Sequence, residues 1–195
     1  YAPSFLCDAH PGLKPDEMHA AILKGIARAE SDFPIAVGLI CLLQRIKTVQ
    51  ENQYWLDFAI EKKADFLAMD LADNELAVGP EVFVPLFEKA KSEGFAVTIH
   101  AGEAAGPQAS RNIRNSIEML HADRIGHGVR ILEDPEVLEF VRERGTVLEL
   151  CPTSNWLSGV CPTREAHPFR DIMDAGIKTT VNTDDPGIMN ISIMD

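Results

Sequence analysis

Three segments of the sequence carry side chains that could act together on one small molecule. One holds His100 and Glu103, another places His127 between two glycines, and a third puts Asp184 beside Asp185. A histidine and a carboxylate can exchange protons with a bound substrate near neutral pH. Histidine and aspartate from separate strands also suit zinc, and they leave positions on the metal open for water and further ligands. These residues therefore predict acid-base chemistry beside a zinc ion.

Each segment also has a purely structural interpretation. His100 could be hydrogen-bonded locally with Glu103 solvated, and His127 could be satisfied by a neighbouring carbonyl group. Asp184 and Asp185 precede a proline and could form a turn that caps a helix. The functional interpretation is favoured because the three segments follow separate apolar runs of the chain in the same way.

Those apolar runs alternate with longer segments of helical periodicity, as expected for strands and helices in alternation. The runs are residues 34–43, 65–71, 95–100, 124–127, 146–151 and 177–182, and residues 1–7 read as the end of a further strand. This order is compatible with a doubly wound sheet or with an eight-stranded barrel.

The position of the polar residues favours the barrel. Asp70, His100, His127 and Asp184 end or follow four different runs, and in a barrel the carboxyl ends of all strands meet at one mouth. We therefore predict an α/β fold, a (β/α)8 barrel of TIM type that is incomplete, with the first strand absent from this chain. Residues 1–195 would form one partial catalytic domain.

Capping residues divide the helical segments. The predicted helix starts are Pro15, Gly79, Ser110 as an N-cap and Asp134, and the predicted helix ends are Gly94 and Gly145. Proline fits the first turn of a helix, and glycine fits the left-handed residue that ends one.

Composition limits the partners of the chain. The 195 residues include 30 acidic and 18 basic ones, a formal charge of -12, which repels nucleic acid and favours a small, weakly charged ligand. The longest apolar stretch, residues 33–43, is too short to cross a membrane. Four cysteines without a Cys-x-x-Cys pair are typical of reduced thiols in a cytoplasmic protein.

Four segments together resemble the adenosine deaminase family. They are residues 98–106 (Thr-Ile-His-Ala-Gly-Glu-Ala-Ala-Gly), 124–128 (Arg-Ile-Gly-His-Gly), 148–155 (Leu-Glu-Leu-Cys-Pro-Thr-Ser-Asn) and 181–187 (Val-Asn-Thr-Asp-Asp-Pro-Gly). Their order and spacing match, and the resemblance covers essentially the whole chain. It implies a barrel of the metal-dependent amidohydrolase type with one zinc ion at its mouth.

The resemblance also implies roles for single residues. His100 and Asp184 would bind zinc, and Glu103 would donate a proton to purine N1. His127 would orient and deprotonate the attacking water, and Asp185 would hydrogen-bond purine N7. Glu103 must then be protonated when substrate binds, which burial in a dry purine pocket would promote by raising its pKa.

The remaining zinc ligands of the family form a His-x-His pair, which these 195 residues lack. We therefore expect a chain truncated at both ends that is inactive as an isolated fragment.

Position 73 departs from the family pattern, in which a glycine usually donates its N–H to purine N3. Asp73 can adopt left-handed backbone more easily than most residues, so that contact can survive. Its carboxylate nevertheless adds bulk and negative charge near an acceptor nitrogen, which affects the expected specificity.

The predicted function is zinc-dependent hydrolytic deamination of adenosine or deoxyadenosine to inosine or deoxyinosine in purine salvage. Two alternatives stay open: a deaminase of adenine or of another 6-aminopurine nucleoside, and a catalytically inactive family fragment that acts as a binding module. The expected partner is a purine nucleoside, with no nucleic acid or membrane. The sequence leaves the oligomeric state open.

Overall fold

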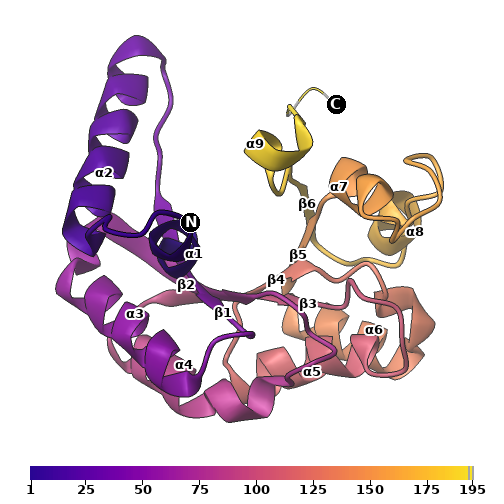
Figure 1. Cartoon of the computed structure of the whole chain (residues 1–195). Coiled ribbons are helices and arrows are strands. Elements are labelled where there is room, and N and C mark those ends of the chain that lie inside the picture. The colour runs from indigo at the N-terminus through magenta and orange to yellow at the C-terminus, as the bar shows by residue number, and fades with distance from the viewer. Residues whose placement is uncertain (193, 195) are drawn as a thin grey trace.

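Six parallel strands form one sheet in sequence order, and helices α3 to α6 line its outer face (Figure 1). The computed structural model describes residues 1–192 and 194. The strands are β1 (Leu39–Gln44), β2 (Phe66–Ala72), β3 (Ala96–Ala101), β4 (Arg124–His127), β5 (Val147–Leu150) and β6 (Thr179–Val181). Every neighbouring pair is parallel. The predicted incomplete (β/α)8 barrel is confirmed, and the sheet is not doubly wound.

The helices connect the strands and extend beyond the two outer ones. They are α1 (Pro3–Ala9), α2 (Pro15–Asp32), α3 (Val49–Glu61), α4 (Val84–Ser92), α5 (Ala109–Met119), α6 (Pro135–Arg144), α7 (Pro152–Leu157), α8 (Phe169–Asp174) and α9 (Pro186–Met189). Short 3-10 turns occupy Lys63–Asp65, Pro80–Phe83 and Ile131–Glu133. None of the helices within residues 1–192 and 194 combines the length and apolar character that a membrane crossing requires.

The core lies between the sheet and the helices that follow the strands. Leu56 of α3, Phe87 of α4 and Ile113 of α5 are fully buried against strand residues such as Met69 and Ile99. Burying large apolar side chains in this layer fixes the strands, and with them the polar residues at the strand ends.

The beginning of the chain differs from the prediction of a strand over residues 1–7. Only Tyr1 makes strand-like hydrogen bonds to β1, donating its terminal nitrogen to Ile40 O at 2.6 Å and accepting from Leu42 N at 3.0 Å. α1 begins two residues later, at Pro3, because proline lacks the N–H that a strand needs and its fixed φ suits the first helical turn.

β1 is also shorter than the apolar run that predicted it. The run begins at residue 34, but pairing with β2 begins only where Leu39 meets Phe66. Ile35 and Val37 lie exposed ahead of the sheet. Hydrophobicity alone did not distinguish these residues from a buried strand.

The helix boundaries agree with prediction except at two positions. Gly79 precedes the 3-10 turn Pro80–Phe83, which leads into α4, and Ser110 is not an N-cap. Asp134 caps α6 by accepting from Glu136 N and Val137 N, and Gly145 ends it with φ of 65°. α5 instead follows Gln108, and the Ser110 hydroxyl donates to Arg130 O at 2.9 Å. The serine was misassigned because its side chain binds a neighbouring loop and not the helix that contains it.

Candidate active site

Two histidines meet at the carboxyl ends of neighbouring strands. His100 is the next-to-last residue of β3 and His127 the last of β4, and their ring centroids are 4.4 Å apart. His100 pairs in register with Gly126, where a Cβ would lie 3.3 Å from the His100 Cα. The glycine before His127 therefore lets the two strands bring both rings together.

Both rings line a cavity of about 420 Å³. Asp70 of β2 and Asp184 after β6 line the same cavity, so the four polar residues that the sequence placed at strand ends do converge. A cavity of this volume falls in the range of small-molecule sites.

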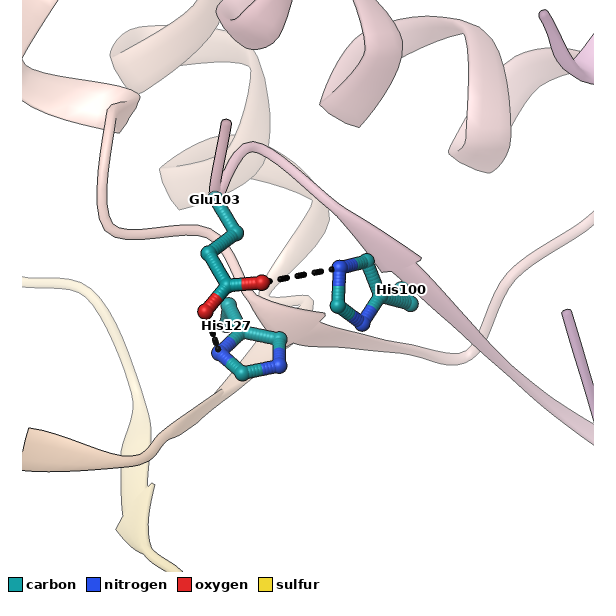
Figure 2. Close-up of side chains that lie close together, drawn as sticks. All are labelled: His100, Glu103 and His127. Carbon is teal, nitrogen blue, oxygen red and sulfur yellow. Dashed lines mark ion pairs between the residues drawn. The ribbon is translucent and has the colours of Figure 1, made fainter. Parts of the chain in front are cut away.

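Glu103 lies between the two rings and contacts each of them (Figure 2). Its Oε2 is 3.1 Å from His100 Nε2, and its Oε1 is 3.4 Å from His127 Nδ1. Gly102 permits the turn that brings Glu103 back, since it has φ of 74° and a Cβ there would lie 2.5 Å from Ile113. The locally hydrogen-bonded histidine of the structural interpretation is thus present, but its partner is a largely buried glutamate.

Glu75 holds the backbone of the loop that carries Glu103. Its buried carboxylate accepts from the backbone nitrogens of Gly102, Glu103 and Ala104, each at 2.8 Å, and from Asn112 Nδ2 at 3.2 Å. No role was predicted for Glu75, although it follows Asp73 in the same segment. Its sequence neighbours Asn74 and Leu76 do not distinguish it from a solvent-exposed carboxylate.

Asn155 is a second residue that the prediction missed. Its Nδ2 is 2.8 Å from Glu103 Oε1 and 3.1 Å from His127 Nδ1, and its Oδ1 is 3.0 Å from His167 Nε2. Asn155 is fully buried and His167 nearly so. Asn155 ends one of the four family-like segments, whereas nothing in the sequence distinguished His167 from an ordinary core histidine.

Asp184 is held by helix α7. The residue has φ of 64°, and its Oδ2 accepts from Ser154 Oγ at 2.6 Å and lies 3.9 Å from His127 Nε2. Asp185 is exposed and does not line the cavity; it precedes α9 without capping it through its side chain. The turn of the structural interpretation therefore exists, but the Asp184 carboxylate points toward the site.

Asp73 does not line the cavity either, although its backbone fits the expectation. It has φ of 84°, the left-handed conformation that the family's glycine would adopt easily. Its carboxylate accepts from Gln44 Nε2 at 3.0 Å, and Gln44 Oε1 accepts from Ser4 Oγ at 2.6 Å.

Burial and charge shift the pKa values of the two histidines in opposite directions. Burial lowers the pKa of His127, and the neighbouring charge of His100 lowers it further. Burial also opposes the charged form of His100, but the hydrogen bond and charge of Glu103 outweigh it and raise the pKa of His100. The pair is therefore best populated with His100 charged and His127 neutral.

The pKa of Glu103 is shifted in the direction opposite to the prediction. Burial alone would raise it, but the hydrogen bond from His100 and the charges of both histidines hold the pKa below its ordinary range. The prediction considered only the burial of this carboxyl group and not the two imidazole rings that face it. Asp70, by contrast, has its pKa raised to about 6, chiefly by burial.

The donor atoms around the cavity fit zinc in their chemistry. His100, Glu103 and His127 bring ligand atoms within 4.8 Å of one another, as do His127, Cys151 and Asp184. Nitrogen, carboxylate and sulfur donors are those that zinc prefers. The predicted ligands His100 and Asp184 share the cavity wall, but within the described part of the chain no such cluster contains both.

Comparison with known proteins accounts for this arrangement. The whole chain, residues 1–195, matches the adenosine deaminase family. An adenosine deaminase of Plasmodium falciparum is 36% identical over 100% of this chain and 53% of its own length. The chain thus spans about half the length of the curated relatives it matches.

Two solved structures also resemble nearly the whole chain, and the chain again covers about half of each. An adenine deaminase from Arthrobacter aurescens superposes with a TM-score of 0.88 at 25% identity, over 96% of this chain and 56% of that one. An amidohydrolase from Burkholderia ambifaria with bound Zn superposes with a TM-score of 0.87 at 31% identity, over 98% of this chain and 53% of that one. The family match, which extends over every residue of the site, leads to one conclusion: the chain belongs to the adenosine deaminase family.

Proposed function

We propose that the protein containing this chain hydrolyses the 6-amino group of adenosine or deoxyadenosine, releasing ammonia and the corresponding inosine nucleoside in purine salvage. The observation that carries the proposal is Glu103, a largely buried carboxyl group that bridges two histidines beside a cavity of small-molecule size. A proton donor and a group that holds water, fixed side by side, are what hydrolytic deamination requires.

Each residue has a role in the proposed reaction. Glu103 protonates purine N1, which makes C6 more electrophilic, and His127 orients the attacking water. His127 and Asp184 lie beside that water, and the proton that the water loses leaves with ammonia. Asp185 and the backbone of Asp73 contact the purine ring at N7 and N3; neither lines the cavity of this chain, so their contacts depend on the bound base.

Zinc would be held by His100 and Asp184 together with ligands from outside these 195 residues. When bound, it would supply a Lewis acid that makes water nucleophilic at neutral pH. The Zn-containing Burkholderia relative supports this assignment.

Zinc bound to His100 would also affect the pKa of Glu103. In this structure His100 Nε2 pairs with Glu103, and that contact is the leading cause that opposes burial in setting the Glu103 pKa. Binding of His100 to a metal through this nitrogen would remove that contact, while the charge of His127 and the hydrogen bond from Asn155 would still oppose burial in setting the Glu103 pKa.

A second candidate substrate is free adenine. The Arthrobacter structure of TM-score 0.88 is named an adenine deaminase, whereas the Plasmodium relative is named an adenosine deaminase. Turnover of adenosine and adenine by the full-length protein separates the two candidates, and dominant turnover of adenine would reassign the substrate.

The direct test of the chemistry is Glu103→Gln in the full-length protein. The amide fills the same space but cannot deliver the proton, so turnover should fall about 100-fold to 10,000-fold while zinc content and inosine binding persist. Ser92→Ala, on the exposed end of α4, is the control. Turnover within a few-fold of wild type would remove Glu103 from the mechanism.

A further inference from the structure

Asn155 contacts both reacting side chains with one amide group. One N–H of Nδ2 can reach Glu103 Oε1 at 2.8 Å and the other can reach His127 Nδ1 at 3.1 Å. These contacts use the full donor capacity of the amide. The geometry thus ties the carboxyl group and the imidazole to a single buried side chain.

His167 determines the orientation of the Asn155 amide group. Burial lowers the pKa of His167 to about 4, so the ring is neutral at pH 7 and carries one proton. That proton belongs on Nε2, which lies 3.0 Å from Asn155 Oδ1. A reversed amide would place Oδ1 against the Glu103 carboxylate. It would also force the His167 proton onto Nδ1, a buried nitrogen that has no hydrogen-bond partner among the described residues, so both neighbours select the same orientation.

We propose that Asn155, held by His167, is a positioning residue that fixes His127 in the tautomer protonated on Nε2. Nδ1 of His127 faces an amide N–H and must act as an acceptor, which leaves the single ring proton on Nε2.

This placement deepens the proposed deaminase function, on which its catalytic meaning rests. A His127 that carries its proton on Nε2 donates a hydrogen bond to the attacking water and cannot take the water's proton. The carboxylate within reach is Asp184, whose Oδ2 lies 3.9 Å from that Nε2. Asp184 is then the group that accepts the proton when the water oxygen bonds to C6, and His127 orients the water as a donor.

The tautomer can be measured without turnover. Nitrogen-15 NMR of the full-length protein labelled at histidine distinguishes the two neutral tautomers, and His127→Gln identifies the His127 signals. We expect the Nε2-protonated form in wild type. In Asn155→Leu, which has similar size and no amide, Nδ1 is free to donate to Glu103 Oε1 at 3.4 Å, and the proton should move to Nδ1.

Activity provides the second readout. Asn155 does not line the cavity, so Asn155→Leu should lower kcat by about 10-fold to 100-fold and leave KM nearly unchanged. His167→Gln keeps an N–H donor for Asn155 and should retain the wild-type tautomer and kcat, whereas His167→Phe should lose both in part. If Asn155→Leu does not fold, the two His167 variants still decide the question.

Two results would overturn the placement: His127 protonated on Nδ1 in wild type, or an unchanged tautomer in both Asn155→Leu and His167→Phe. A wild-type protein that deaminates no purine would defeat the proposed function instead, and the NMR comparison would still test the role of Asn155.

Discussion

The two ends of the polar site are held very differently. His127, at the end of β4, is 3% exposed, whereas Val181, at the end of β6, is 55% exposed. β4 pairs with strands on both sides, but within residues 1–192 and 194 β6 pairs only with β5. Glu103 and His127, the inner end of the site, therefore lie inside the paired sheet, while Asp184 and Asp185, the outer end, follow the last strand of this incomplete barrel.

The hydrogen bonds show the same difference. Glu103 is fixed through its backbone by Glu75 and through its side chain by Asn155, both of which are buried. Among the residues that the structure describes, the close hydrogen-bond partner of the Asp184 side chain is the Ser154 hydroxyl. Because positioned groups lose little entropy when they react, the inner end is suited to donate a proton to the substrate and to orient the attacking water.

Replacing Glu75 should loosen the inner end most. In Glu75→Gln an NH2 group faces backbone N–H donors that now contact an oxygen, so we expect a loss of about 2–4 kcal/mol in the free energy of unfolding. Urea unfolding measures it, with exposed Glu88→Gln as the matched control. Equal stability of the two variants would mean that Glu75 does not hold the loop.

Replacing Ser154 should loosen the outer end. Ser154→Ala removes the hydrogen bond that orients Asp184, and loss of such a contact to a metal ligand typically weakens metal affinity by about 10-fold to 100-fold. We expect about 10-fold weaker zinc binding in competition with a chelator. Ser158→Ala, whose hydroxyl bonds only the backbone oxygen of Ser154, should leave affinity unchanged; an effect as large as that of Ser154→Ala would point to the helix and not to Asp184.

The inner end should also respond to acid. The pKa of His167 is about 4 in the folded protein, below the value of about 6.5 for an unfolded histidine. Its contribution to stability is therefore full above about pH 6.5 and is lost as the pH falls toward 4, because the unfolded chain takes up the proton first. His167→Gln removes this contribution, so its Tm should fall less between about pH 7 and 5 than that of wild type or of His10→Gln. Parallel Tm curves would show that His167 is not held neutral.

The smallest effect should come from Asp73. In Asp73→Gly the left-handed backbone is kept and the carboxylate held by Gln44 is lost, so KM for adenosine should fall a few-fold with little change in kcat. Steady-state kinetics measures both constants, and Asp73→Asn separates charge from bulk. An unchanged or higher KM in Asp73→Gly would mean that the carboxylate is neutral or beneficial for binding.

The sequence predicted the barrel and the convergence of His100, His127 and Asp184, because strand ends follow from hydrophobic periodicity and parallel strands end at one mouth. It did not predict the residues that hold this site. Glu75 and His167 act through contacts with Glu103 and Asn155, 28 and 12 residues away along the chain, and such pairings have no periodic signature. The shift in the Glu103 pKa was missed for the same reason, since its sign depends on two imidazoles brought in by folding.

Ammonia release tests the central claim most directly. The full-length protein, supplied with zinc and adenosine, should release one ammonia for each inosine formed, and removing zinc with a chelator should stop the release until zinc is restored. Failure to release ammonia from adenosine, deoxyadenosine and adenine by the folded, zinc-loaded protein would contradict the account, and the buried Glu103 pair would then need another function.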